Sequence, residues 1–464
     1  MTNDQDIKHE ELSQELINRW PESHPQPSLD RIKALCNLLA DPQEACPVIQ
    51  ITGTNGKGST AIMIDALIRA MGLRTGRFSS PHLVDVRERI CVDGEPISKE
   101  RFDELYEEIE PFVQMVDEQK IGGVKMTFFE VITAMAYAAF ADAPVDVAIM
   151  EVGMGGKWDA TSVADAKVGV VGPIALDHMH LLGDTVAEIA EEKSGVVKHG
   201  GVGVFAGQQP EAASVLTKRC VEVGASMKRE GIDLGLLDRQ PGVGGQLIRI
   251  DTSGGPVSDI FLPLFGAHMA HNAALAVAAV EAFQGGKPLN PEIINEGLGN
   301  VKAPARLELV HSEPTVILDT AHNPHGVKAT LAGLREVFPD NPVICVCAMM
   351  ADKQTGKVLE MLSDEVDYLI ATTIPDNPRA DSAADFADQA QGAFGAGRVR
   401  MSERPEEALA IAMGMADTRA DDAVVLVLGS VYLAGLIRPR LIDENNTEKA
   451  SWQVDVISSK EELK

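Results

Sequence analysis

Short apolar runs alternate with amphipathic segments from about residue 47 onward. Apolar runs rich in β-branched residues predict strands, and apolar positions repeating every three to four residues predict helices. Buried strands that alternate with helices are typical of a mainly parallel sheet covered by helices on both faces. In the first part of the chain we expect strands Val48–Ile51, Val145–Met150, Val168–Val171 and Val202–Phe205, with helices Thr60–Met71, Phe129–Phe140 and Ala273–Phe283.

The same alternation resumes after Lys302 and predicts a second, smaller, doubly wound α/β domain. Its expected strands are Thr315–Leu318, Val343–Ala348, Tyr368–Thr372 and Val424–Leu428, and its helices include Gly326–Phe338 and Glu406–Met415. Between the two parts, residues 235–255 are rich in glycine and alternate polar with apolar positions. This pattern predicts a small antiparallel addition at the edge of the first sheet.

Four regions follow from these patterns. We expect a helical N-terminal segment over residues 1–46, a central domain over 47–301, a C-terminal domain over 302–441 and a polar tail over 442–464. Pro304 stands at the predicted boundary between the two domains.

Composition narrows the class of protein. The chain has 464 residues and a formal net charge of −28, from 41 basic and 69 acidic residues. Such a surface repels a phosphate backbone, so we expect no nucleic-acid partner. The sequence predicts no membrane span, and the acidic, polar start lacks a signal-peptide pattern. We therefore expect a cytoplasmic monomer with reduced thiols, Cys345 and Cys347 being buried strand residues.

A glycine-rich turn follows the first predicted strand and precedes a helix. In such a turn, backbone N–H groups and the helix N-terminus can bind phosphate, and a lysine can reach the β- and γ-phosphates. The general P-loop pattern has Gly at position 51 and Ser or Thr directly after the lysine, whereas this chain has Ile51 and Gly58. The alternative is an ordinary βα turn, but a phosphate loop is the better interpretation. Its residues are Thr54, Asn55, Gly56, Lys57, Gly58 and Ser59.

Polar residues follow several predicted strands at their carboxyl ends, where open parallel sheets bind ligands. Ser80, Glu151, His178 and Asp319 all occupy such positions. Hydroxyl and carboxylate oxygens suit Mg²⁺, so Ser80 and Glu151 are metal candidates. Glu151 could instead cap a helix, and a single loop histidine such as His178 is more often structural.

These motifs together resemble the folylpolyglutamate synthase/dihydrofolate synthase family of the Mur ligase superfamily, of the bacterial bifunctional type. The resemblance covers about residues 45–435. The blocks that carry it are residues 53–59 (Gly-Thr-Asn-Gly-Lys-Gly-Ser), 79–83 (Ser-Ser-Pro-His-Leu), 151–156 (Glu-Val-Gly-Met-Gly-Gly), 176–178 (Leu-Asp-His), 192–195 (Glu-Lys-Ser-Gly) and 319–324 (Asp-Thr-Ala-His-Asn-Pro).

The resemblance implies an ATP-dependent amide ligase with an N-terminal P-loop-type ATPase domain. Its substrates would be dihydropteroate, reduced folates and L-glutamate, joined through an acyl phosphate. It places Mg²⁺ at Ser80, Glu151 and His178, and a carbamylated Lys193 whose carboxylate bridges to a second Mg²⁺. Lys193 could otherwise be a solvated helix lysine. Lys57, Lys193 and His322 are the implied catalytic residues.

The resemblance also assigns ATP contacts to Asn272, Arg306 and Asp319. Two positions depart from the family pattern: Ala305 replaces the usual Gly and Met269 the usual Gln. Ala305 would be strained if that turn requires a positive φ.

Two segments resemble the family's pterin-binding regions, although Phe128 and Phe129 could equally belong to the core. These segments are Thr127, Phe128, Phe129 and Glu130, and Trp158, Asp159 and Ala160. Asp352, Lys353, Gly429 and Ser430 are candidates for the amino-acid pocket. Arg379 is either a substrate contact or a surface arginine.

Three other functions remain as alternatives. A monofunctional folylpolyglutamate synthase would lack activity on dihydropteroate. A nucleotide-switch ATPase would carry a Walker-B strand ending in Asp, whereas the comparable strand here ends in Glu151. A cell-wall Mur ligase would need a further N-terminal domain for a UDP-sugar, and we expect too few residues for one.

Overall fold

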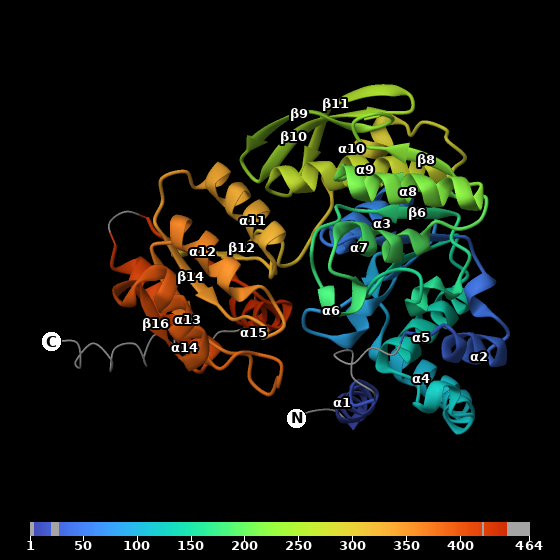
Figure 1. Ribbon diagram of the computed structural model, residues 1–464, viewed down its shortest axis with the longest axis horizontal. Helices are drawn as coiled ribbons and strands as arrows, with labels where there is room; N and C mark the ends of the chain where they lie inside the picture. The colour runs from blue at the N-terminus through green and yellow to red at the C-terminus, as the bar shows by residue number, and fades with distance from the viewer. Residues whose placement is uncertain (1–3, 20–26, 420–421, 443–464) are drawn as a thin grey trace. The chain divides into compact units, whose positions relative to one another are not determined.

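The computed structural model describes residues 4–19, 27–419 and 422–442 (Figure 1). The chain divides into two compact units. The first comprises Met1–Pro263 with His268–Lys302, and the second comprises Leu264–Ala267 with Ala303–Lys464. The expected polar tail lies outside the described residues, except for Ile442, which ends the last helix.

An eight-stranded sheet forms the centre of the first unit, in the order β4-β3-β2-β5-β1-β6-β7-β8. The run from β2 to β8 is parallel, and β3 and β4 are antiparallel additions at one edge. The mainly parallel sheet predicted from the sequence is therefore confirmed. Its strands are β1 (Val48–Thr52), β2 (Thr75–Phe78), β3 (Ile90–Val92), β4 (Glu95–Pro96), β5 (Val147–Glu151), β6 (Val168–Val171), β7 (Val202–Phe205) and β8 (Ser226–Arg229).

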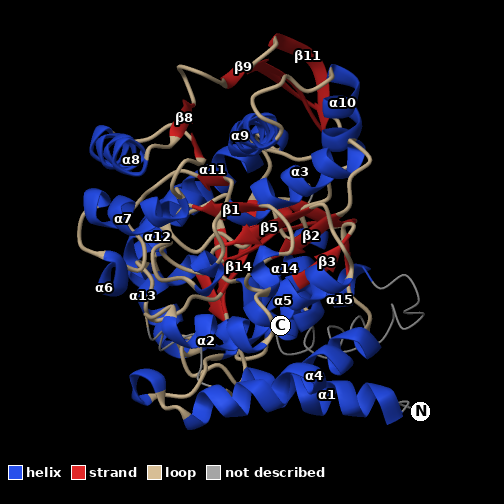
Figure 2. Cartoon of the chain, turned by 90° about the vertical axis from the view of Figure 1, so that its right-hand side faces the viewer, coloured by secondary structure: helices blue, strands red, loops and turns tan. Residues whose placement is uncertain are grey.

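Helices cover both faces of this sheet. Figure 2 shows α3 over one face of β1, β5 and β2 and α5 against the other, and α4 packs on α5. No helix in the described part of the chain is both long and apolar enough to cross a membrane. The helices are α1 (Asp4–Ile17), α2 (Asp30–Leu38), α3 (Lys57–Ala70), α4 (Lys99–Glu118), α5 (Phe128–Asp142), α6 (Met179–Leu182), α7 (Val186–Lys193), α8 (Pro210–Val223), α9 (Ala267–Phe283) and α10 (Pro291–Gly299).

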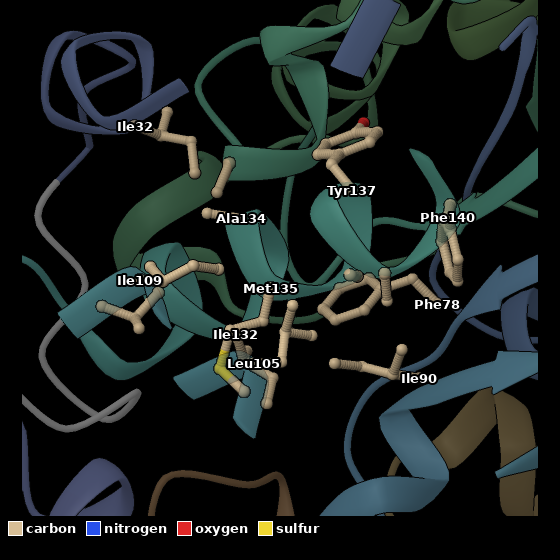
Figure 3. Close-up of a cluster of buried hydrophobic side chains, with 14 of the residues drawn as sticks. Ile32, Phe78, Ile90, Leu105, Ile109, Ile132, Ala134, Met135, Tyr137 and Phe140 are labelled. Carbon is tan, nitrogen blue, oxygen red and sulfur yellow. The ribbon is translucent and has the colours of Figure 1, made fainter. Parts of the chain in front are cut away.

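The largest part of the core lies between α5, α4 and the sheet. Helix α5 is apolar almost all round, which suits a helix buried on several sides. Phe78, Ile90, Met135 and Phe140 meet there, as Figure 3 shows. Gly76 in β2 leaves room for the Phe140 ring, since a Cβ at Gly76 would lie 2.4 Å from it.

Three antiparallel strands, β9 (Gly235–Gly242), β10 (Gly245–Thr252) and β11 (Gly255–Leu262), form a sheet of their own. The antiparallel prediction is confirmed, but its placement at the edge of the first sheet is wrong. Alternate residues such as Ile248 and Ile250 are buried on one face, and α10 packs against β11. A hydrophobic face of this size can be covered by a helix without pairing to the main sheet.

The second unit has a six-stranded sheet in the order β12-β13-β17-β14-β15-β16. Only β12 is antiparallel to its neighbour. Cys345 and Cys347 are buried in β14, as predicted. The strands are β12 (Glu308–Ser312), β13 (Thr315–Leu318), β14 (Val343–Cys347), β15 (Tyr368–Ala371), β16 (Val399–Met401) and β17 (Val424–Leu428), and the helices are α11 (Pro324–Val337), α12 (Thr355–Glu365), α13 (Ala383–Phe394), α14 (Pro405–Asp417) and α15 (Val431–Ile442).

Two glycines, one in each unit, test whether the space around a glycine is filled or open. A Cβ at Gly169 in β6 would lie 2.5 Å from the carbonyl oxygen of Val196, so Gly169→Ala should destabilise the fold by about 1–3 kcal/mol through overpacking. Gly392 in α13 has open space around it, so Gly392→Ala should stabilise by roughly 0.5–1 kcal/mol. Urea denaturation would measure both, and a neutral Gly169→Ala would contradict the close approach.

Candidate active site

The glycine-rich loop leaves β1 at its carboxyl end and is held by the loop that follows β6. The backbone N–H of Thr54 donates to Pro173 O at 2.9 Å, and its hydroxyl donates to Ala175 O at 3.0 Å. Gly53 has a φ of +154°, and a Cβ there would meet the backbone of Gly172 at 3.1 Å. These bonds fix the loop without using the N–H groups that follow Thr54.

Helix α3 begins at Lys57, three residues earlier than the sequence pattern predicts. Gly56 adopts a left-handed φ of +81° and accepts the first helical hydrogen bond, from the N–H of Thr60 at 2.9 Å. Lys57 therefore starts the helix rather than lying in the turn, and Ser59 is buried in the first helical turn. The positive end of the helix dipole is at this loop, together with Asn55.

Two lysines meet at one carbonyl oxygen. Lys57 Nζ lies 3.1 Å from Gly53 O, and Lys193 Nζ, from the last residue of α7, lies 3.0 Å from the same atom. Lys193 is only 4% exposed, which rules out the solvated helix lysine considered from the sequence. Burial first, and then the charge of Lys57, lowers the pKa of Lys193 to about 7. Its amine is therefore readily available in the neutral form.

Glu151, at the end of β5, approaches the same helix N-terminus. Its Oε2 accepts a hydrogen bond from the backbone N–H of Ser80 at 3.1 Å. A Cβ at Gly58 would lie 3.4 Å from that oxygen, so Gly58 borders the Glu151 carboxylate.

Of the expected metal ligands, Ser80 and Glu151 lie in direct contact. Ser80 and Glu151 are neighbours and offer hydroxyl and carboxylate oxygens, a donor set that fits Mg²⁺. His178 caps α6 with a left-handed φ of +50°, and its ring lies 4.0 Å from Asp177 Oδ1. Within the described ranges, no group of three or more His, Cys, Asp or Glu residues is arranged to hold a metal ion.

Asn272 lies against the phosphate loop. It is a buried residue of α9, and a Cβ at Gly56 would meet its Oδ1 at 2.8 Å. The fold thus brings a distant residue beside the loop, where the family resemblance expects a nucleotide contact.

In the second unit, the Asp319 carboxylate is buried and engaged on both oxygens. Oδ2 accepts from the N–H of Leu307 at 2.9 Å, and Oδ1 accepts from the N–H of Ala321 and the hydroxyl of Thr330. Asp319 therefore holds the chain around residue 307 in place.

Arg306 occupies a strained turn. Its neighbours Ala305 and Leu307 have left-handed φ angles of +52° and +47°. The strain expected at Ala305 is thus present, since only glycine adopts this region without cost. Glu308 Oε2 accepts from the N–H of Ala305 at 2.7 Å, and Glu308 is itself paired with Arg438. Carboxylates on both sides hold the turn that presents Arg306.

The loops after β13, β14 and β15 carry further candidates of this unit. His322 Nδ1 lies 2.9 Å from Thr320 O, just before α11. Arg379 pairs with Asp352 at 3.0 Å, so it is engaged within the protein. A cavity of about 430 Å³ opens at the start of α12, lined by Ala351, Lys353, Gln354, Thr355, Gly356, Lys357, Asp381 and Gln389.

Three of the four residues in the first aromatic segment, Thr127, Phe128 and Glu130, are buried. Thr127 and Glu130 form a capping box at the start of α5, and Glu130 pairs with the buried Arg31. Phe128 is buried beneath the Arg89 guanidinium, 4.8 Å from the ring centroid. Sequence reasoning did not single out either arginine. The sequence did contain a signal for Arg31, because it occupies an apolar position of α2. An arginine at such a position is expected to be buried and therefore to need an acidic partner.

Phe129 and Trp158 border the loop that follows Glu151. The Phe129 ring packs edge-on against Phe78 at 5.7 Å, and a Cβ at Gly153 would lie 2.7 Å from the tip of Phe129. Trp158 lies beside Gly155, 3.5 Å from a Cβ placed there. Both side chains are half-buried, so part of each ring is accessible.

The buried carboxylate of Asp159 holds the backbone of this loop in place. Its carboxylate accepts from the N–H groups of Met154 and Thr161, at 3.1 and 3.0 Å. Burial raises the pKa of Asp159, partly offset by these hydrogen bonds. Ala160 is also buried.

Comparison with known proteins identifies the family. Residues 51–280 match the Mur ligase middle domain, and residues 305–431 match the Mur ligase glutamate ligase domain. A dihydrofolate synthase/folylpolyglutamate synthase of Mycobacterium tuberculosis is 43% identical over 91% of this chain and 92% of its own length.

Solved structures agree. A Mycobacterium tuberculosis folylpolyglutamate synthase complexed with ADP matches with a TM-score of 0.91 and 42% identity, over 94% of this chain and 99% of that one. The Escherichia coli FolC structure, in complex with DHPP and ADP, has a TM-score of 0.81 and 29% identity, over 95% of this chain and 98% of that one. The chain belongs to the Mur ligase family and, within it, to the bifunctional dihydrofolate synthases/folylpolyglutamate synthases.

Proposed function

We propose that one centre in this chain adds L-glutamate both to dihydropteroate and to reduced folates, at the expense of ATP. The observation that carries this proposal is the convergence of Lys57 and Lys193 on Gly53 O, at the N-terminus of α3. Cationic groups and a helix N-terminus together favour a polyphosphate. Family membership supports the choice of substrates.

The reaction has two steps. A substrate carboxylate oxygen attacks the γ-phosphorus of ATP, which forms an acyl phosphate and releases ADP. The neutral amine of glutamate then attacks the acyl carbon, phosphate leaves, and the amine loses a proton. Lys57 would stabilise the charge on the transferring phosphoryl group, because an oriented cation acts most strongly where negative charge develops.

Mg²⁺ would be held by the oxygens of Ser80 and Glu151, with His178 as the third ligand expected from the family. The ion neutralises phosphate charge when bound. Support for its location comes from the Ser80–Glu151 hydrogen bond beside Gly58.

Lys193 is proposed to carry a carbamate, whose carboxylate would help to hold a second Mg²⁺. Its neutral amine attacks CO₂, a C–N bond forms, and one proton is released. Burial and a pKa of about 7 support this, because only the unprotonated amine is nucleophilic.

The roles of the remaining residues are proposed from family membership. Asn272 and Arg306 would bind the nucleotide, and Asp319 would act there through the turn that it holds. His322 is proposed as a catalytic group. The cavity beside Lys353 is our candidate for the glutamate carboxylates, since an ammonium group and a helix N-terminus both favour anions.

Phe129 and Trp158 are the proposed contacts of the pterin ring, because flat aromatic rings stack on planar heterocycles. These two rings would be held in place by their buried neighbours in the chain, which are Thr127, Phe128, Glu130, Asp159 and Ala160. Dihydropteroate is shorter than dihydrofolate by one glutamate, so one centre can serve both reactions if the ring occupies two positions.

Product mass analysis tests the function directly. With ATP and glutamate, the protein should convert dihydropteroate to dihydrofolate and lengthen tetrahydrofolate by glutamate units. A folded Lys57→Ala variant should lose on the order of 10²–10³ in rate on both substrates. Near-normal turnover by that variant would contradict the phosphate-loop role, and a parent protein inactive on dihydropteroate would leave the monofunctional alternative.

Phe129→Ala should weaken the use of dihydropteroate more than that of tetrahydrofolate. The expected loss is roughly 1–3 kcal/mol, from aromatic burial and stacking. Comparison of kcat/KM for the two substrates measures it. Equal losses on both would count against two pterin positions, and Leu237→Ala on the exposed face of β9 serves as a control.

Lys193→Met tests the buried amine through stability. Because the folded-state pKa of about 7 lies below the ordinary 10.5, the unfolded chain binds the extra proton between these values. The stability of the parent should therefore rise with pH across this window, and the part that depends on Lys193 is lost as pH falls toward 7.

In CO₂-depleted buffer without nucleotide, Lys193→Met should be more stable than the parent at pH 7. This advantage should shrink toward pH 10, by up to about 1.4 kcal/mol per pH unit. Urea unfolding at several pH values measures the difference, with the exposed Lys218→Met as control. A difference that does not vary with pH would show that Lys193 is not a buried neutral amine.

A further inference from the structure

The chain that leads into α5 is held by two carboxylates, each paired with an arginine of the N-terminal segment. Asp117 Oδ1 accepts from the N–H of Met126 at 2.7 Å, and its other oxygen pairs with Arg19. Glu130 pairs with Arg31 of α2. Both acidic residues thus connect residues 1–46 to the segment that carries Phe129.

The Arg31–Glu130 pair is the more deeply buried. Arg31 is 2% exposed, and its Nε lies 3.0 and 3.1 Å from the two oxygens of Glu130. The same carboxylate accepts from the N–H of Thr127 at 2.8 Å, while the Thr127 hydroxyl accepts from the N–H of Glu130. Glu130 cannot rotate away without breaking the ion pair and the helix cap together.

Phe129 directly precedes Glu130 and has little freedom of its own. The tip of its ring lies so close to Gly153 that a Cβ there would be at 2.7 Å, and its edge contacts Phe78. A small rotation of the first turn of α5 would move the ring into or away from the loop after Glu151. The position of the ring therefore depends on the contact that fixes this turn.

We propose that Arg31 is a positioning residue for the pterin-containing substrates, acting through Glu130 on Phe129. This inference rests on the proposed role of Phe129 as a pterin contact. Arg31 does not touch the reacting atoms. It gives the N-terminal helical segment a part in substrate recognition, because removing its guanidinium would leave the buried Glu130 charge without its partner.

Arg31→Lys is the informative substitution, since it keeps a positive charge but loses the Nε–H that lies 3.0 and 3.1 Å from the two oxygens of Glu130. We expect the KM for dihydropteroate to rise about tenfold, which corresponds to ~1.4 kcal/mol, while the KM for ATP changes less than about twofold. Equal shifts in both KM values, or an unchanged KM for dihydropteroate, would overturn the proposal.

A matched control separates positioning from stability. His9 and Asp103 form another buried pair, which joins α1 to α4 but has no contact with the capping box. His9→Gln should lower the melting temperature as Arg31→Lys does, without the selective change in KM. If His9→Gln produces the same selective change, the effect is general loosening and the proposal fails.

The double variant Arg31→Lys/Phe129→Ala distinguishes this inference from the proposed site. If Arg31 acts through Phe129, the double variant should bind dihydropteroate no worse than Phe129→Ala alone. Additive losses would show that Arg31 acts by another route. If Phe129→Ala has no effect by itself, the proposed pterin contact fails, and the inference fails with it.

Discussion

The carbonyl oxygen of Gly53 is the point on which the rest of the site depends. It accepts from two lysine amines that come from the start of α3 and the end of α7, about 140 positions apart in the chain. Burial, and then the charge of Lys57, lowers the pKa of Lys193 to about 7, so the packing favours a neutral amine beside Gly53 O. The positive end of the α3 dipole lies at the same loop, and an anion is favoured there.

A net charge of −28 does not exclude an anion site of this kind. The anionic substrates of this family would be repelled by the surface as a whole, but screening limits that field to ~8 Å at physiological salt. Within the site, Lys57, Lys193 and the N-terminus of α3 act at hydrogen-bond distance. These groups act on a bound anion more strongly than the distant surface carboxylates do, because they are close, oriented and partly buried.

Several acidic residues near the candidate sites hold the backbone in place. Asp159 supports the loop after β5, Asp319 holds the strained turn beside Arg306, and Glu130 caps α5 while pairing with Arg31. Each is buried and accepts backbone N–H groups. Such carboxylates fix the backbone on which a neighbouring side chain is placed. A sequence motif therefore includes residues that hold the backbone as well as residues proposed to contact the substrate.

The sequence by itself determined the alternation of strands and helices, the glycine-rich turn between β1 and α3, and the family, because these depend on local periodicity and short motifs. Strands β6, β7, β13 and β17 have the predicted bounds. The start of α3 was missed by three residues because the left-handed turn at Gly56 replaces a side-chain cap.

Only the tertiary structure decided which side chains are buried and what they meet. The pattern Glu191-Glu192-Lys193 is typical of a solvated helix end, yet the packing of α7 buries Lys193 against Gly53. Likewise, Gly58 of the glycine-rich loop borders a carboxylate that is distant in sequence, that of Glu151. Contacts of such long sequence separation leave no periodic signal, since they arise from the crossover of strands in the sheet and not from the local chain.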